Sequence, residues 1–225
     1  MSAVLRLVDA AALEDLGRYA SRARAVDADG AMRLQATGGV LAAWVGVLQG
    51  SGILAEGTVL GLRTFALAEA VEVDAVVPLG AVTDRTAHHG GGTDLPLPPT
   101  RALAAWAAVT PPRGPWEPAG SLPGDLLARV ARDGLAEVTD AVRERGAAAG
   151  FVRDRVWARD VREAAGPHPD LLVADGVPGT DATVRAGGAF AAYALGFLAP
   201  GEPVQVLRSN RWTRLTAPGG HVLMR

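Results

Sequence analysis

The sequence predicts an α+β fold, in which an N-terminal antiparallel sheet with flanking helices is followed by a long helix and a small C-terminal β-meander. Three observations predict it. Apolar residues repeat every three to four positions in residues 10–25 and 123–145, as they do in amphipathic helices. Residues 31–48 instead form two apolar runs around a Gly-Gly pair, which favours a hairpin. Residues 203–225 alternate strand-like runs with Ser-Asn and Pro-Gly-Gly turns.

The N-terminal half begins with the first of these helices, and Asp9 is its expected N-cap. Pro78 is expected at the start of a second, short helix, where its missing N–H costs nothing. The remaining elements are strands, which we expect at residues 31–36, 40–48, 58–67 and 102–109.

A proline-rich connection divides the chain. Residues 110–118 hold four prolines, which fix φ and remove hydrogen-bond donors, so neither a helix nor a central strand fits there. We therefore expect an N-terminal α+β domain at residues 1–110 and a C-terminal helical plus β-meander domain at residues 119–225. Trp116 is predicted to be largely buried, because indole rings usually pack against other groups.

The C-terminal half is predicted to be helical first and then β. After the long helix we expect a second helix at residues 151–157, a loop at 166–183, and a short apolar helix at 188–198. Three strands follow at residues 203–208, 211–216 and 221–225, with a two-residue turn at Ser209-Asn210.

Composition excludes several kinds of chemistry. All 22 basic residues are arginine, so no lysine can form a Schiff base or bind phosphate in a P-loop. Cysteine is absent, which excludes thiolate nucleophiles, disulfides and Cys-ligated zinc. The net charge of −2 provides no overall attraction to nucleic acid or to anionic lipid.

The N-terminus predicts a soluble, cytoplasmic protein. Asp9, Glu14 and Asp15 follow the first apolar residues so closely that no signal-peptide hydrophobic region fits. Residues 34–55 carry no charge, but only 40–48 are continuously apolar, which suits a buried strand better than a membrane span. We therefore expect no membrane association.

Three distinctive runs suggest a resemblance. They are GLRTFAL at residues 61–67, TPPRGPWEP at 110–118 and RWTRL at 211–215. With these runs the chain resembles an uncharacterised protein family of high-GC actinobacteria with no assigned function, and the resemblance spans residues 1–225. It implies no catalytic or binding residue.

Two glycine-rich strings resemble functional motifs, but their surroundings favour loops. Residues 50–55, GSGILA, fit the dinucleotide-binding pattern after an apolar strand, yet the next residues favour a strand rather than the required helix. Residues 89–92, HGGG, match an oxyanion loop, but no Gly-x-Ser-x-Gly nucleophile elbow exists. His88 and His89 lack the spacing of a helical zinc pair. We expect no catalytic residue, no cofactor and no metal.

The C-terminal arginines are the candidate ligand site. Arg208, Arg211, Trp212 and Arg214 lie in a segment without acidic residues, and arginine and tryptophan suit the recognition of anions. A turn at Ser209-Asn210 would place Arg208 directly opposite Arg211. Such a pair is unfavourable unless a bound anion, or a carboxylate of the long helix such as Glu137 or Glu144, neutralises it.

These observations favour a non-enzymatic binding or protein-interaction protein that recognises a small anionic ligand. The alternative is a small carboxylate-dependent enzyme acting on a phosphate- or carboxylate-bearing substrate. A weaker alternative is nucleic-acid contact through the basic C-terminus. Gly188, Ala192 and Gly196 form a narrow helix face, which could pack on the long helix or form the seam of a homodimer.

Overall fold

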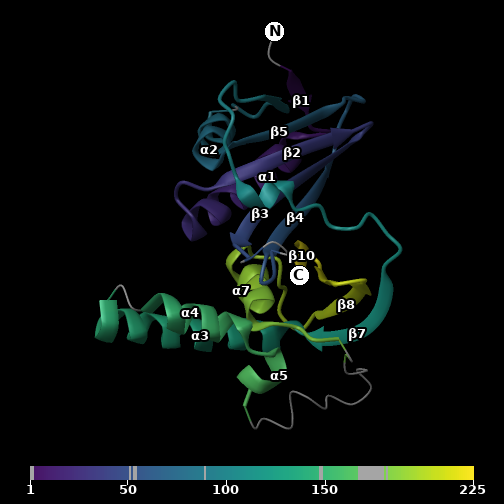
Figure 1. Ribbon diagram of the computed structural model, residues 1–225. Coiled ribbons are helices and arrows are strands. Elements are labelled where there is room, and N and C mark those ends of the chain that lie inside the picture. The colour runs from purple at the N-terminus through teal and green to yellow at the C-terminus, as the bar shows by residue number, and fades with distance from the viewer. Residues whose placement is uncertain are drawn as a thin grey trace. The chain divides into compact units, whose positions relative to one another are not determined.

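The computed structural model describes residues 3–50, 52, 55–88, 90–146, 149–166, 180 and 182–225 (Figure 1). The chain forms two compact units. Unit 1 comprises Met1–Val47 and Leu60–Thr110, and unit 2 comprises Leu48–Val59 and Pro111–Arg225. The predicted α+β class, with an N-terminal antiparallel sheet, a long helix and a C-terminal meander, is confirmed.

Unit 1 is built on the antiparallel strands β5-β2-β3-β4, in that order across the sheet. A separate two-stranded sheet joins β1 to β6. The elements in chain order are β1 (Val4–Arg6), α1 (Ala10–Val26), β2 (Ala31–Thr37), β3 (Val40–Leu48), β4 (Val59–Ala66), β5 (Val73–Pro78), α2 (Leu79–Ala87), β6 (Asp94–Pro96) and the 3-10 helix η1 (Ala105–Ala108).

Helix α1 begins where the sequence predicts. The Asp9 carboxylate accepts a hydrogen bond from the Ala12 N–H at 2.7 Å and so caps the helix. Its inner face buries Leu13, Leu16 and Tyr19, and the Tyr19 hydroxyl reaches the Ala43 carbonyl of β3 at 3.5 Å. The apolar spacing in the sequence therefore determines which face of the helix meets the sheet.

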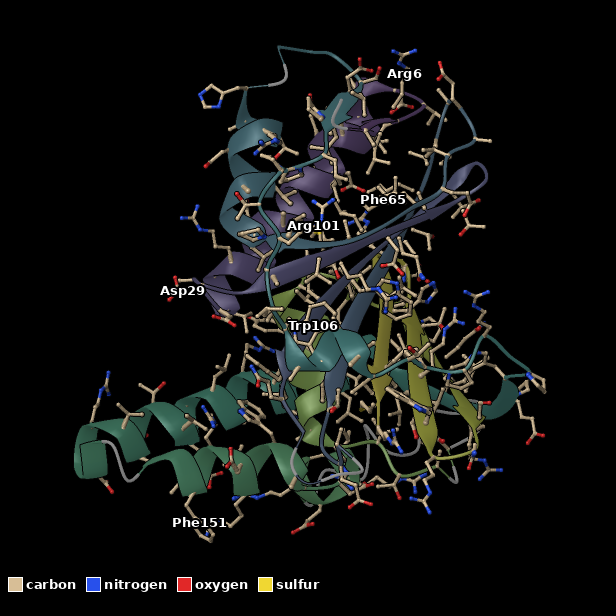
Figure 2. The ribbon with its side chains drawn as sticks, turned by 45° about the horizontal axis from the view of Figure 1, so that its top comes forward. Arg6, Asp29, Phe65, Arg101, Trp106 and Phe151 are labelled. Atoms are coloured by element: carbon tan, nitrogen blue, oxygen red, sulfur yellow. The ribbon has the colours of Figure 1, made fainter. Side chains whose placement is uncertain are left out.

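The predicted strand at residues 102–109 is wrong, because this segment contains η1. Trp106 is 7% exposed and its indole covers Gly46 of β3, where an added Cβ would lie 2.5 Å from the ring (Figure 2). Arg33 donates to the Ala107 carbonyl at 3.0 Å and holds the segment in place. Burying the indole on the sheet face therefore replaces strand pairing here.

Unit 2 combines helices with the antiparallel strands β10-β9-β8-β7, in that order. Its elements are β7 (Glu117–Pro123), α3 (Gly124–Arg145), α4 (Ala149–Ala158), α5 (Val161–Ala164), α7 (Ala186–Ala194), β8 (Pro203–Ser209), β9 (Trp212–Ala217) and β10 (Gly220–Met224). Helices α3 and α4 lie side by side in Figure 1. Most of the loop predicted at 166–183 lies outside the described residues.

Small residues let the helices of unit 2 approach their neighbours closely. The Trp157 ring stacks on Phe190 at 4.7 Å and also covers Gly134 of α3. At Gly188 of α7 an added Cβ would lie 2.2 Å from the Met224 sulfur. The glycine face that the sequence offered as a dimer seam is therefore occupied, at Gly188, within the chain.

The proline-rich connection leads into β7, which is an edge strand paired only with β8. Its register shifts between Pro118 and Ser121, as expected for a strand that contains proline. Trp116 is half-buried rather than largely buried, so that prediction is wrong in degree. In the ranges that the structure describes, no helix is both long enough and apolar enough to cross a membrane.

Candidate functional site

The turn between β8 and β9 sets the positions of the candidate arginines. Ser209 pairs with Trp212 and Arg208 pairs with Thr213, so the turn consists of Asn210 and Arg211. Asn210 has a φ of 53°, a left-handed conformation that asparagine tolerates better than most residues. The predicted pairing of Arg208 with Arg211 is therefore wrong by one residue, and no like-charge pair arises there.

Arg208 and Arg211 consequently have different surroundings. Arg208 lies opposite Glu117 in the pairing of β7 with β8, which places a carboxylate beside its strand position. Arg211 is exposed in the turn. The expected neutralisation by the long helix is not seen for Glu137, which instead accepts two hydrogen bonds of 2.6 Å from Arg159.

The strand register gathers a different set of residues on one face of the meander. Because side chains alternate along a strand, Trp212, Arg214 and Thr216 share this face of β9. Arg214 lies opposite Leu223, and Thr216 lies opposite His221, on β10. The next position on the same face is Arg225, a diagonal neighbour of Arg214 at a Cβ separation of about 7–8 Å. We call Arg214, Thr216, His221 and Arg225, together with Trp116, the arginine face.

Arg214 is the centre of this face. Its Nε donates to the Thr216 hydroxyl at 3.1 Å, and its Nη2 lies 3.1 Å from Nδ1 and 3.3 Å from Nε2 of His221. The guanidinium lies 5.8 Å from the centre of the Trp116 ring, a cation–π distance. Among the described residues no carboxylate pairs with Arg214, and its Nη1 group has no hydrogen-bond acceptor. Partial burial therefore lowers the pKa of Arg214, and no neighbouring carboxylate among the described residues raises it again.

His221 adds no positive charge at neutral pH. Burial, and then the charge of Arg214, lower the pKa of His221 from 6.5 to about 4. One nitrogen of the neutral ring is consequently an acceptor, which matches the donor of Arg214. The charge of the arginine face thus comes from its arginines.

Arg225 provides the second cation. Its guanidinium lies 6.0 Å from the centre of the Trp212 ring, and its buried Nε has no hydrogen-bond partner among the described residues. Trp212 itself is only 6% exposed, so it packs against Arg225 and offers no open surface on which a ligand could stack. The role expected for Trp212 is therefore not supported by its position.

Of the four predicted site residues, only Arg214 belongs to the arginine face. Trp212 is buried against Arg225, and Arg208 and Arg211 lie elsewhere. Sequence reasoning missed Trp116, Thr216, His221 and Arg225 as members of one site. Period-two alternation across β9 and β10 would have gathered three of them once the turn between these strands was placed at Pro218-Gly219. Trp116 carries no such signal, because it arrives from the proline-rich connection.

The structure describes the other motif-like strings only in part. The element that follows the GSGILA string is β4, so the helix that a dinucleotide site requires is lacking there. His89 of the HGGG string lies outside the described residues, and Gly90 and Gly91 have φ values of 58° and 81°, as in a turn. Within the described part of the chain, no three His, Asp or Glu side chains gather closely enough to hold a metal ion.

The fold and this site define an α+β protein of two units in which Arg214 and Arg225, near the C-terminus, each lie over a tryptophan ring. The chain belongs to the family described as Domain of unknown function (DUF8185), which matches residues 111–225. Residues 1–108 match a second family, described as Domain of unknown function (DUF8010). No curated protein matches the chain. Neither family description names an activity, so the function has to be argued from the geometry.

Proposed function

We propose that the protein binds a small anionic ligand at the arginine face of unit 2. The observation that carries the proposal is Arg214, whose half-buried guanidinium has no carboxylate partner among the described residues. A desolvated cation without a counter-charge is unfavourable. A bound oxyanion would accept from the Nη1 group of Arg214 and would also attract Arg225, its diagonal neighbour.

This proposal favours binding over catalysis. The arginine face holds hydrogen-bond donors and a neutral imidazole, and none of its side chains is a carboxylate that could act as a general acid or base. The phosphate or carboxylate group of the ligand supplies the missing charge, while Trp116 shields the cation from water on one side.

The test is site-resolved titration with inorganic phosphate and citrate, followed by the side-chain N–H signal of Arg214 and the ring signals of His221. We expect both to shift with saturation, and the melting temperature to rise with ligand concentration. Arg214→Met should abolish the shifts of His221. The matched control is Arg153→Gln, an exposed arginine of α4 that pairs with Asp154. Equal binding by Arg214→Met and the control would overturn the proposal.

Location and association are parts of the same proposal. We propose a cytoplasmic location, which fractionation of the native cell would test. Exposed apolar side chains support a homodimer. They are Val142 in the last turn of α3, which is 51% exposed, and Phe151 in the first turn of α4, which is 75% exposed and labelled in Figure 2. Sedimentation should then show a dimer for the native chain and a shift towards monomer for Phe151→Glu.

A further inference from the structure

A row of polar side chains crosses the C-terminal strands beside Arg214. His221 of β10 lies opposite Thr216 of β9, and Thr216 lies opposite Gln205 of β8. Gln205 in turn lies opposite Ser121 of β7. Residues directly opposite each other in antiparallel strands point to the same side of the sheet, with Cβ atoms about 4.5–5.5 Å apart. These four side chains therefore form one row on the side of the sheet that carries the arginine face, and we call it the polar row.

The two halves of the polar row differ in how their hydrogen bonds are used. The Thr216 hydroxyl accepts from Nε of Arg214 at 3.1 Å and lies 3.3 Å from Nδ1 of His221, so this half is engaged within the protein. Gln205 is exposed and Ser121 is half-buried, and neither side chain has a hydrogen-bond partner among the described residues. An amide and a hydroxyl can each donate and accept. Gln205 and Ser121 therefore offer both kinds of group to a ligand.

No carboxylate of the described strands β7 to β10 points to this side of the sheet. Glu117 is the acidic residue that these strands contain, and it lies opposite Arg208. Arg208 follows Leu207, which lies opposite Arg214, so Arg208 and Glu117 point to the other side. A ligand that bears a negative charge thus meets hydrogen-bonding groups beside Arg214 and no like charge from these strands.

The spacing between Arg214 and the unused half of the row sets the size of the ligand. Arg214 lies opposite Leu207, so Gln205 is its diagonal neighbour, at a Cβ separation of about 7–8 Å that long side chains can span. Ser121 lies one strand further, two strand spacings or about 10 Å from β9. A ligand whose oxyanion is held at Arg214 therefore needs further polar groups, several bonds away from that oxyanion, to reach Gln205 and Ser121.

We infer that the ligand of the arginine face is an oxyanion joined to a polyhydroxylated carbon skeleton, as in a sugar phosphate or a sugar acid, and that Gln205 and Ser121 bind its hydroxyl groups. The inference rests on the proposed function, because it places the oxyanion at Arg214. Each sugar hydroxyl both donates and accepts, as the amide of Gln205 and the hydroxyl of Ser121 do. These two residues are then specificity-determining, since an anion without hydroxyl groups makes no hydrogen bond of this kind with them.

The experiment compares glucose 6-phosphate with butyl phosphate, which carries the same phosphate monoester on a chain without hydroxyl groups. Each is titrated into the full chain and followed by the ring signals of His221 and the side-chain amide signals of Gln205. We expect glucose 6-phosphate to bind about tenfold more tightly, as expected for two additional hydrogen bonds, and to shift the Gln205 signals, which butyl phosphate should leave unchanged. Gluconate in the same titration distinguishes a carboxylate from a phosphate, and glucose should not bind.

A double variant tests the two residues directly. Gln205→Met combined with Ser121→Ala removes both hydrogen-bonding groups and nearly keeps the length of the first side chain. We expect its affinity for glucose 6-phosphate to fall about tenfold, to that for butyl phosphate, while its affinity for butyl phosphate stays within about twofold of the native value. The matched control is Gln35→Met in unit 1, where Gln35 donates to Asp74 at 3.3 Å, and this variant should bind both phosphates as the native chain does.

The outcomes separate this inference from the proposed function. Arg214→Met should abolish the binding of both phosphates, and retention of butyl phosphate binding in that variant would overturn the proposed function together with this inference. Equal affinity of the native chain for the two phosphates, with both lost in Arg214→Met, would overturn this inference alone. An unchanged preference for glucose 6-phosphate in the double variant would do the same. The comparison in the native chain decides the matter even if the double variant does not fold.

Discussion

One arginine of each unit, Arg33 in unit 1 and Arg214 in unit 2, shows opposite surroundings. In unit 1, Arg33 forms a two-point contact with Asp74, at 2.7 Å from Nε and 2.6 Å from Nη2, and it also holds the Ala107 carbonyl. In the meander of unit 2, Arg214 contacts a threonine, a neutral histidine and a tryptophan ring instead. An arginine with a carboxylate holds the fold together, whereas an arginine without one is available to a ligand.

The same contrast appears in the pKa values. The hydrogen bonds that Arg33 donates to Asp74 lower the pKa of the Asp74 carboxyl and raise the pKa of the Arg33 guanidinium, so each group stabilises the charged form of the other. Burial lowers the pKa of Arg214. Folding of unit 1 therefore stabilises the charged forms of Arg33 and Asp74, whereas folding of unit 2 leaves the charge of Arg214 without a neutralising partner among the described residues.

The largest effect is expected when the chain is cut at the proline-rich connection that precedes most of unit 2. Residues Leu48–Val59 belong to unit 2 although they precede most of it in sequence. The Gly57 N–H donates to the Arg225 carbonyl at 2.8 Å, the Arg225 N–H donates to Thr58 at 3.0 Å, and Leu48 packs on Gly187. A fragment of residues 111–225 lacks all three contacts, so we expect no cooperative unfolding transition by circular dichroism.

The fragment of residues 1–110 is the matched control, since it contains all of unit 1 and should unfold cooperatively. Adding a peptide of residues 48–59 should restore structure to the C-terminal fragment. If residues 111–225 unfold alone with the midpoint of the full chain, the sequence-based boundary at 110–118 is also the boundary of independent folding, and our expectation is wrong.

The next effect compares the two arginines directly. Arg33→Met removes a pair and a hydrogen bond to η1 and leaves Asp74 without its partner, so we expect the free energy of unfolding to fall by about 1–2 kcal/mol. Arg214→Met removes a cation that lacks a counter-charge, so we expect a change within about 0.5 kcal/mol, or a gain. Urea denaturation of both variants without ligand measures this difference. An equal loss in both would show that Arg214 is structural.

A smaller difference between the two regions is expected in how the free energy of unfolding depends on pH. His221 has a pKa of about 4 in the folded state against 6.5 as a free side chain. The unfolded chain therefore binds its proton first, and the free energy of unfolding should fall as the pH drops from 6.5 towards 4, by about 1 kcal/mol after allowance for solvent screening. The contribution of Asp74, whose pKa is lowered, is lost only as the pH falls below its ordinary value of 3.8. Denaturation at a series of pH values measures both losses of unfolding free energy. The loss between pH 6.5 and 4 should disappear in His221→Gln, and the loss below pH 3.8 should disappear in Arg33→Met.

Much of the fold could be predicted because its signals are local. The Asp9 cap, the apolar period of α1 and the Gly38-Gly39 turn depend on residues next to each other, and these elements appear where expected. The segment at 102–109 could not be predicted, because its conformation depends on Gly46, far away in the sequence. Alternating apolar residues predict a strand both when a segment pairs with a sheet and when it lies across the face of the sheet, so the pattern does not distinguish the two cases.

The arginine residues expected from the sequence and the arginine face of the structure share only Arg214. A shift of one residue in a turn changes which residues lie opposite each other, and the choice between Ser209-Asn210 and Asn210-Arg211 decided whether Arg208 lies opposite Arg211 or Thr213. Pairing of Arg159 with Glu137, and of Arg33 with Asp74, also depends on tertiary contacts between distant segments. Sequence composition shows an excess of arginine, but only the fold shows which of these lack a carboxylate.

The smallest expected effect tests whether Arg211 lies outside the ligand site that contains Arg214. Arg211 is exposed in the turn, whereas Arg214 is half-buried between Trp116 and His221. Charges exposed to water are screened within about 8 Å at physiological salt, so Arg211→Ala should change the free energy of unfolding by less than about 0.5 kcal/mol. Its affinity for phosphate at the arginine face should stay within about threefold of the native value, because an exposed charge contributes little beyond general attraction. Titration of Arg211→Ala beside Arg214→Met, both followed at His221, measures this. Loss of phosphate binding in Arg211→Ala, with binding retained in Arg214→Met, would place the ligand site at the turn. The proposed function, which rests on Arg214 lacking a carboxylate partner, would then be wrong.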